Sequence, residues 1–246
     1  MNKLRLWLES HLPALFRPAE TTVHVDIAGV ELTLRDWEGS NVLAIVPKEI
    51  LDDDYKLRPI DFRPGDVVVD IGANIGIVAL YLAKKHPGIR IIAIEPVPTT
   101  FRHLRENIEL NGVSNITALN CAVTNDGRDL EMIVNPGHSG GSTGHLRNMT
   151  QPGHYNLTVQ SRTLDRIFDE YVPGRCQLLK IDCEGAEYEI LGAAQCLHRV
   201  DHLGIEIHHN DFLTSQGHTP EGLLTEVSRV IPRERIAYTT TPMFDR

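Results

Sequence analysis

Residues 66–76 read DVVVDIGANIG and residues 89–96 read IRIIAIEP, with a helical pattern of apolar residues between them. The first segment is an apolar strand that ends at Asp70 and then turns through Gly72 and Gly76. The second segment is another apolar strand, which ends at Glu95. A strand, a tight turn, a helix and a second strand in this order are typical of the first β-α-β unit of a Rossmann-like domain. The chain is therefore predicted to be an α/β protein whose mostly parallel sheet carries helices on both faces.

The spacing of the glycines indicates which ligand this turn can hold. A dinucleotide-binding loop has the pattern G-x-G-x-x-G, in which the bare second glycine lets the backbone approach a pyrophosphate. Here Asn74 stands at that position and Gly76 falls one residue early, so a diphosphate fits poorly. The turn suits a cofactor that has no phosphate and carries an amino-acid tail. Asp70, Asn74 and the backbone N–H groups from Gly72 to Gly76 can bind such a tail.

Glu95 completes the cofactor prediction, because it ends the strand that follows the turn. A carboxylate can accept hydrogen bonds from both hydroxyl groups of a ribose. S-adenosylmethionine combines a ribose with an amino-acid tail and has no phosphate. It is therefore the cofactor that this β-α-β unit predicts.

The composition is that of an ordinary soluble chain of 246 residues, with 41% hydrophobic and 23% charged residues. Its net charge is −9 and it has no long basic run, which argues against a nucleic-acid partner. No apolar run approaches the roughly 18 residues that a membrane span needs. The four cysteines form no C-x-x-C pair. We therefore expect a cytoplasmic protein with reduced thiols.

Residues 1–60 are expected to form an elaboration in front of a Rossmann-like domain of residues 61–246. Apolar residues recur with helical spacing between positions 4 and 15, which predicts a short amphipathic helix that packs on the domain or on a partner subunit. Alternation over residues 22–47 predicts a β-hairpin. The acidic segment that follows precedes the cofactor strand, and its Tyr55 is a candidate to fold over the site. The amphipathic helix and a shortened sheet edge are compatible with a homodimer, and attachment of the helix to a membrane surface is the less favoured alternative.

The rest of the chain continues to alternate between helices and strands, which predicts a parallel sheet. Residues 129–134 and 156–161 are expected to form an antiparallel pair around a long loop rich in Gly and His. A last strand is predicted at about 235–240. Because few residues follow Ser228, one strand fits comfortably there and a second barely does, so we expect the edge of the sheet to be shortened or to be completed by a partner.

A second polar cluster follows the strand predicted at residues 177–182. Lys180, Asp182 and Glu184 surround its carboxyl end, which is where open α/β sheets bind their ligands. The next strand ends in IEIHHN, and its period of two places Glu206 and His208 on one face and His209 on the other. We expect these strand ends to converge on one cleft.

These motifs resemble the FkbM-type S-adenosylmethionine-dependent methyltransferases. The resemblance rests on VVVDIGANIG at 67–76, IEP at 94–96, TLD at 163–165 and KIDCEGAE at 180–187, where Cys183 replaces the usual Val. It implies a class I methyltransferase fold and methylation of a hydroxyl group, commonly on a sugar or a secondary metabolite. It also implies residue roles. The cofactor contacts would be Asp70, Gly72, Asn74 and Glu95, the adenine would lie by Asn120 or Ala122, and the floor of the reaction site would be Asp182 and Glu184.

The acceptor side of the site requires a group that takes up the proton of a weakly nucleophilic alcohol. His208 is the first candidate base, because neutral imidazole suits that task near pH 7. Asp182 and Glu184 are alternatives, although Glu184 is equally well explained as a helix N-cap. The acceptor contacts are expected to come from Tyr55, Lys180, Glu206 and His209, with Lys180 also paired to an acid.

Four further possibilities stay open at the level of the sequence. Asp182, Glu206 and His208 could bind Mg²⁺ or Mn²⁺, but no spacing motif specifies a metal site, so no metal is expected. N-methylation is the alternative to O-methylation, because carboxylates can equally orient an amine. A nicotinamide-dependent oxidoreductase and a catalytically silent cofactor-binding partner are the other functional classes.

Overall fold

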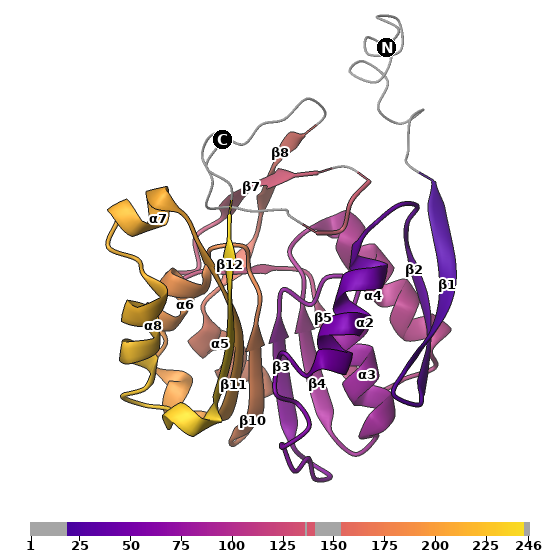
Figure 1. The fold of residues 1–246 in the computed structure, drawn as a ribbon, viewed down its shortest axis with the longest axis horizontal. Coiled ribbons are helices and arrows are strands. Elements are labelled where there is room, and N and C mark those ends of the chain that lie inside the picture. Colours follow the sequence, from indigo (N-terminus) through magenta and orange to yellow (C-terminus); the bar gives the residue numbers. More distant parts are fainter. Residues whose placement is uncertain (1–18, 136, 141–153, 244–246) are drawn as a thin grey trace, which may run out of the picture.

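The computed structural model describes residues 19–135, 137–140 and 154–243. Within these residues, a sheet of six parallel strands forms the centre of the molecule (Figure 1). Its spatial order is β12 (Ile236–Pro242), β11 (Val200–His209), β10 (Cys176–Ile181), β3 (Val67–Ile71), β4 (Arg90–Ile94) and β5 (Ile116–Leu119). The strand order reverses between β3 and β10, as in doubly wound α/β folds. The predicted fold class is confirmed.

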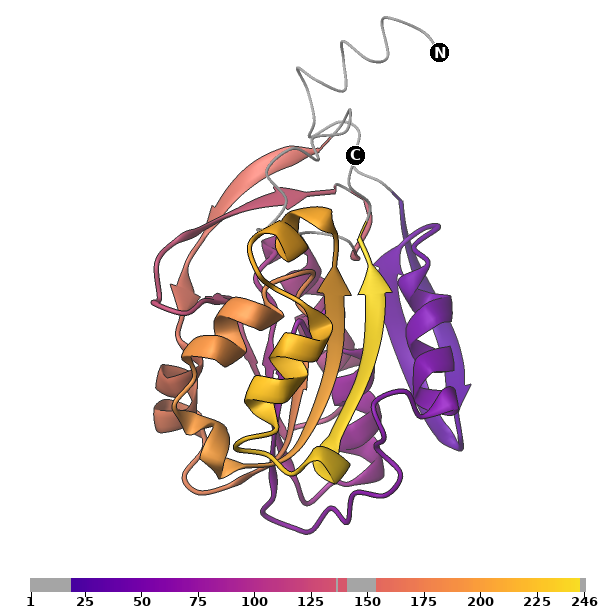
Figure 2. The ribbon, with the colours of Figure 1, turned by 60° about the vertical axis from the view of Figure 1, so that its left-hand side comes forward.

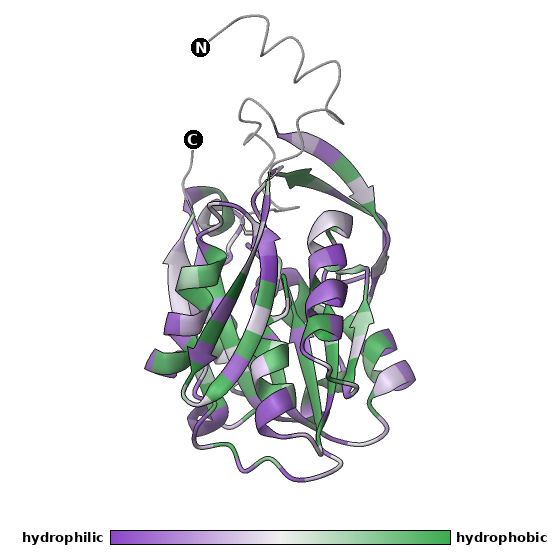
Figure 3. Ribbon diagram, turned by 90° about the vertical axis from the view of Figure 1, so that its right-hand side faces the viewer, coloured by the Kyte–Doolittle hydropathy of each residue, from purple (hydrophilic) through white to green (hydrophobic). Residues whose placement is uncertain are grey.

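Helices cover both faces of this sheet, as Figures 1 and 2 show. The larger helices are α2 (Val42–Asp52), α3 (Ile77–Lys85), α4 (Pro98–Leu110), α5 (Leu164–Tyr171), α6 (Glu187–Ala193) and α8 (Pro220–Val227). Figure 3 shows hydrophobic and hydrophilic residues alternating along the helices that flank the sheet. This alternation is the pattern of helices that bury one face and expose the other.

The alternation of side chains along β3 divides the core into two layers. Val67 and Val69 face a cluster that includes residues of α5, α6 and α8, whereas Val68 faces a cluster with α2, α3 and α4. All three valines are at most 3% exposed. A strand that is apolar on both faces is typical of the centre of a parallel sheet.

The predicted N-terminal hairpin is confirmed by β1 (Glu20–Ile27) and β2 (Val30–Trp37), which pair in antiparallel register. The strand pattern ends at Trp37, however, and not near residue 47, because α2 occupies residues 42–52. Val42, Val46 and Ile50 recur every four residues and pack on the sheet, so their spacing fits a helix better than a strand. The helix predicted within residues 4–15 lies outside the described residues.

In the second half of the chain, some elements match the bounds predicted from the sequence and others differ from them. β7 (Leu130–Val134) and β8 (Tyr155–Val159) form the predicted antiparallel pair, above the carboxyl ends of the parallel strands in Figure 1. The sequence pattern predicts a further helix over about residues 185–197, but α6 is shorter, because Asp165 accepts hydrogen bonds from the backbone N–H groups of Gln195 and Cys196. The short helix α7 (Asp211–Ser215) was not predicted.

The final strand β12 pairs in parallel with β11 and forms an edge of the sheet. The expectation that one strand follows the last helix is therefore correct for the described residues. The short strands β6 (Ala122–Val123) and β9 (Ser161–Arg162) pair beside the sheet. None of the helices in the described part of the chain is long and apolar enough to cross a membrane.

Candidate active site

A pocket opens at the carboxyl ends of β3 and β10, where the strand order reverses. It holds ≈ 700 Å³ of space, part of it open to solvent. The turns after neighbouring parallel strands meet at this edge, so residues far apart in the sequence share one wall. Six residues singled out from the sequence lie in that wall, namely Gly72, Asn74, Glu95, Ala122, Asp182 and Glu184.

The turn after β3 requires glycine at its first position. Gly72 has a φ of +74°, and a Cβ placed on it would lie 1.8 Å from the carbonyl oxygen of Asp182. The turn thus packs directly against the end of β10. This contact brings the DIGANIG motif of residues 70–76 next to the KIDCEGAE motif of residues 180–187. Asn74 also has a positive φ, of 54°. Asn adopts this left-handed conformation more readily than most residues with a side chain.

Glu95 closes the other side of this turn. Its Oε2 accepts a hydrogen bond of 3.1 Å from the backbone N–H of Asn74, and its Oε1 accepts one of 2.8 Å from Val97. Burial raises the pKa of Glu95 to about 7, although these two backbone donors oppose the shift. Each carboxylate oxygen has two lone pairs, so each can accept a further bond from a ligand hydroxyl.

Asp70 and Lys180 form a buried ion pair beside the pocket. Asp70 Oδ1 lies 3.1 Å from Lys180 Nζ, and the two residues are 1% and 3% exposed. Burial opposes the charge on Lys180, but the attraction of Asp70 holds its pKa well above the usual value. Neither oxygen of Asp70 accepts a well-formed hydrogen bond from the described residues. Lys180 therefore serves first to compensate Asp70, as expected for an ion pair.

Tyr55 lies against this ion pair from the N-terminal segment. Its ring centroid is 5.2 Å from Lys180 Nζ, and its hydroxyl donates a hydrogen bond of 3.2 Å to Glu49 of α2. Burial raises the pKa of Tyr55. Tyr55 is 5% exposed and is not part of the pocket wall, so it packs beside the site. Its predicted contact with the acceptor stays a prediction.

His208 lies among carboxylates at the end of β11. Its Nδ1 is 3.0 Å from Oε1 of the buried Glu187, and its Nε2 is 3.6 Å from Glu184 and 3.8 Å from Glu206. Burial disfavours its charge, but the hydrogen bond to Glu187 and the nearby acids raise the pKa of His208 to about 10. In this state the ring is an imidazolium at neutral pH and cannot take up a proton. The neutral imidazole assumed for a catalytic base is not what this arrangement favours.

Comparison with known proteins shows to which family this chain belongs. Residues 70–229 match the model of the methyltransferase FkbM domain, which is most of the chain. The chain belongs to the FkbM methyltransferase family. It is therefore a methyltransferase, and the resemblance noted from its motifs is confirmed.

Three methyltransferases from other organisms are similar to this chain. Methyltransferase 1 of Beauveria bassiana is 31% identical over 193 residues, which cover 70% of this chain and 76% of the relative. The 31-O-demethyl-FK506 methyltransferase FkbM of Streptomyces tacrolimicus is 39% identical over 90 residues, which cover 36% of this chain and 34% of the relative. A third relative, methyltransferase sdnD of Sordaria araneosa, is 30% identical over 172 residues, which cover 58% of this chain and 66% of the relative.

Within this FkbM domain, the KIDCEGAE motif forms a structure that differs from the expected one. Helix α6 begins at Glu187, and Glu184 has a φ of 53° three residues earlier, so the interpretation of Glu184 as an N-cap is wrong. Glu187 Oε1 instead accepts the backbone N–H groups of Cys183 and Gly185. Burial raises the pKa of Glu184 to about 7, although about a third of its side chain is exposed.

Three further predicted site residues lie outside the wall of the pocket, as do Asp70, Tyr55, Lys180, Glu206 and His208. Asn120 donates hydrogen bonds to the carbonyl oxygens of Glu95 and Pro96, and so orders the loop between β4 and α4. Gly76 begins helix α3, and its missing Cβ leaves room for Leu104 of α4. The alternation of β11 places His209 on the face opposite His208.

Reasoning from the sequence missed the polar contacts of Ser139. This residue lines the pocket, and its carbonyl oxygen accepts a hydrogen bond of 2.9 Å from the side chain of Asn74. Its hydroxyl donates a hydrogen bond of 2.7 Å to Asp36 of β2. Because Ser139 lies in a long loop without periodicity, only the folded chain shows that it reaches the site.

The wall of the pocket fits S-adenosylmethionine. Glu95 presents carboxylate oxygens that retain acceptor capacity for a ribose diol. Ile94, Ala122 and Val123 supply an apolar stretch of the same wall, on which an adenine ring can pack. The close turn at Gly72 lies between Glu95 and the acids at the end of β10. These residues would hold the cofactor, and it would supply the methyl group.

Proposed function

We propose that this methyltransferase uses S-adenosylmethionine to methylate a hydroxyl group of a small molecule. The observation that carries the proposal is the continuity of one pocket. Its wall includes Glu95, which suits a ribose, and also Asp182 and Glu184, which suit a hydroxyl group of an acceptor. Cofactor and acceptor groups thus have adjoining places in the same crevice.

The chain's own residues would bind both reactants, align them and exclude water. S-adenosylmethionine supplies a methyl group on a sulfonium that is already a good leaving group. Alignment of the acceptor oxygen with that methyl group is then the main requirement, with contact distances of roughly 3 Å. Asp182 and Glu184 can orient the acceptor hydroxyl by accepting its hydrogen bond. Ser139 and Gly140 close part of the wall against solvent.

The charges at this end of the pocket favour a neutral acceptor. Asp182 lies 3.8 Å from Lys180 Nζ, and Glu184 lies 3.6 Å from His208 Nε2, so the acids already have cationic neighbours. A protonated amine would compete with those cations, whereas a hydroxyl group would not. A relative whose name describes methylation of an FK506 oxygen agrees with this choice. N-methylation of a neutral amine is the second candidate.

Calorimetric titration of the full chain with S-adenosylmethionine and S-adenosylhomocysteine tests the cofactor. We expect saturable binding of both, with at least tenfold weaker binding in Glu95→Ala. The matched control is Glu109→Ala, because the Glu109 side chain is 73% exposed on α4 and lies outside the pocket wall. Binding of a nicotinamide dinucleotide in place of both ligands would overturn the proposal.

A second experiment separates an enzyme from a silent cofactor-binding protein. The full chain is incubated with S-adenosylmethionine carrying a labelled methyl group and with panels of hydroxylated and amine-bearing small molecules. Label transferred to oxygen in a product supports O-methylation, and label transferred only to nitrogen supports the second candidate. Cofactor binding without transfer to any acceptor would favour the silent partner.

A further inference from the structure

A second feature of the acceptor side is a compact group of three potential metal ligands. Asp182 follows β10, while Glu206 and His208 lie two residues apart on β11. Each offers one ligand atom, and these atoms all lie within 4.8 Å of one another. In an octahedral shell with bonds of about 2.1 Å, adjacent ligand atoms are about 3 Å apart and opposite ones about 4.2 Å apart. Small side-chain rotations therefore suffice to bring all three atoms onto one cation.

The ring of His208 is already oriented as a metal-binding histidine would be, and an incoming metal ion would displace the proton from its Nε2. Its Nδ1 is held 3.0 Å from Glu187 Oε1, and Glu187 is fully buried. His208 is itself 4% exposed, and its Nε2 faces Glu184 and Glu206 at distances too long for hydrogen bonds among the described residues. A carboxylate that fixes one ring nitrogen while the other faces a group of acids is the usual second shell of a metal site.

The local charge is also compatible with a metal cation at this place. Asp182, Glu184, Glu187 and Glu206 all lie around the end of β11, and Lys180 is committed mainly to Asp70. Thr241 of β12 donates a hydrogen bond to Glu206, which fixes that carboxylate from the edge of the sheet. A divalent ion at this place would interact with carboxylates that also have His208 and Lys180 as cationic neighbours.

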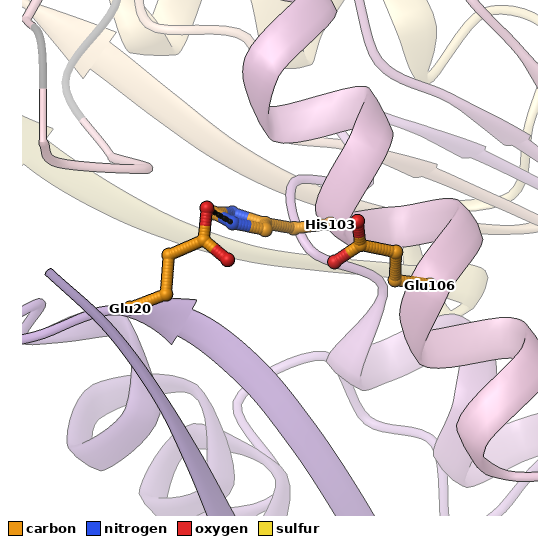
Figure 4. A group of neighbouring side chains, drawn as sticks. All are labelled: Glu20, His103 and Glu106. Atoms are coloured by element: carbon orange, nitrogen blue, oxygen red, sulfur yellow. Dashed lines mark ion pairs between the residues drawn. The ribbon is translucent and has the colours of Figure 1, made fainter. Parts of the chain in front are cut away.

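A second group in the described residues has the same ligand types but a different character. Glu20 of β1 lies beside His103 and Glu106 of α4, as Figure 4 shows. The guanidinium of Arg102 is 2.6 Å from Glu20 and 2.8 Å from Glu106, and it also contacts His103. An internal cation thus already occupies the space between these acids. The group at Asp182 has no such guanidinium among the described residues.

We propose that Asp182, Glu206 and His208 bind one divalent cation, Mg²⁺ or Mn²⁺, on the acceptor side of the pocket. Two carboxylates suit both ions, and the imidazole ligand suits Mn²⁺ better than Mg²⁺. Three protein ligands leave further coordination positions for water or for an oxygen of the acceptor. If the proposed function holds, an acceptor hydroxyl bound there would be more acidic, and its proton would pass to water or to Glu184 without a neutral imidazole base.

The test measures binding of Mn²⁺ to the full chain by electron paramagnetic resonance of the free ion, with no acceptor present. We expect saturation near one Mn²⁺ per chain and competition by excess Mg²⁺. Glu206→Gln and Asp182→Asn keep the side-chain shape, and each should weaken binding at least tenfold. Glu187→Gln tests the orientation of His208, and second-shell changes of this kind typically weaken affinity about 10–100-fold. Glu106→Gln is the matched control and should bind as the unaltered chain does.

Folding and cofactor binding are measured on the same samples by thermal unfolding and by titration with S-adenosylmethionine. Absence of saturable Mn²⁺ binding to a folded chain, or binding that Glu206→Gln leaves unchanged, would overturn the metal site. Cofactor binding without Mn²⁺ binding refutes the metal site alone. Mn²⁺ binding without cofactor binding refutes the proposed function and leaves the metal site standing.

Discussion

The hydroxyl of Ser139 donates a hydrogen bond of 2.7 Å to the fully buried carboxylate of Asp36. This bond joins two segments that are about a hundred residues apart, the N-terminal hairpin and the loop over the cofactor pocket. The same Ser139 accepts the side-chain N–H of Asn74, and the backbone of Asn74 donates to Glu95. The hairpin is therefore connected to the predicted ribose-binding residue by a continuous set of hydrogen bonds.

The first prediction concerns this connection. Asp36→Ala should weaken the binding of S-adenosylmethionine about fivefold or more, because the loss of its buried hydrogen bond costs about 1 kcal/mol and leaves the Ser139 hydroxyl only its 3.1 Å contact with Ser40. Ser139→Ala should produce a similar loss, and the double variant should be little worse than either single one. Calorimetry provides the measurement, with the exposed neighbour Glu38→Ala as control. Additive losses in the double variant would show that the two residues act separately.

The second prediction concerns the close approach of the turn to the end of β10. Gly72→Ala should destabilise the fold strongly, because its Cβ would lie 1.8 Å from the carbonyl oxygen of Asp182. Gly29→Ala is a matched control, since Gly29 has a φ of +83° and no atom within 4 Å of the added carbon. Gly29→Ala should lower the free energy of unfolding, measured with urea, by only about 1–2 kcal/mol, which is the cost of a left-handed backbone at a residue with a side chain. Equal losses in both variants would mean that the turn can move away from Asp182.

Much of this fold follows from local patterns in the sequence. The runs that became β3 and β4 are apolar on both faces, and the glycine turn between β3 and α3 is specified by single residues. Such signals do not depend on distant partners. One boundary error arose where a tertiary contact intervened, because the carboxylate of Asp165 binds backbone groups 30 residues further along the chain at Gln195.

Part of the candidate site was also predictable from the sequence, because its residues follow the ends of strands. Residues at the ends of parallel strands, such as Glu95 and Asp182, must meet at one edge of the sheet, so topology alone brings them together. The protonation of His208 was not predictable, because it depends on Glu187 packing against the ring. Ser139 and Asp36 were not predictable either, because no periodic pattern marks a contact between a loop and a distant strand.

The third prediction concerns pH, and it follows from Glu95. Its pKa is raised to about 7 by burial, so the carboxyl becomes protonated as the pH falls through 7 and loses acceptor capacity for ribose hydroxyls. Affinity for S-adenosylmethionine should therefore increase from pH 6 to pH 8. Calorimetry across this range provides the measurement, and Glu95→Gln should abolish the part of the dependence that belongs to this residue.

The same group predicts an opposite trend in stability without cofactor. The raised pKa means that the folded chain binds this proton more tightly than the unfolded chain, whose Glu has a pKa of 4.5. The contribution of Glu95 to stability is then complete below pH 4.5 and is lost as the pH rises to about 7. Comparison of unfolding free energies of the unaltered chain and Glu95→Gln across pH 5 to 8 isolates this term. A difference that does not vary with pH would show that Glu95 does not titrate in this range.

The last prediction concerns the buried pair of Asp70 and Lys180. Lys180→Met should destabilise the fold by about 3–5 kcal/mol, because it leaves the carboxylate of Asp70 buried without a counter-charge. Asp70→Asn removes the other charge and should also be costly. The double variant should lose much less than the sum of the two, since it leaves neither charge unpaired. Urea unfolding of the four chains provides the measurement, and Lys48→Met at an exposed ion pair should change stability little. Strict additivity would mean that solvent, and not Lys180, stabilises the charge on Asp70.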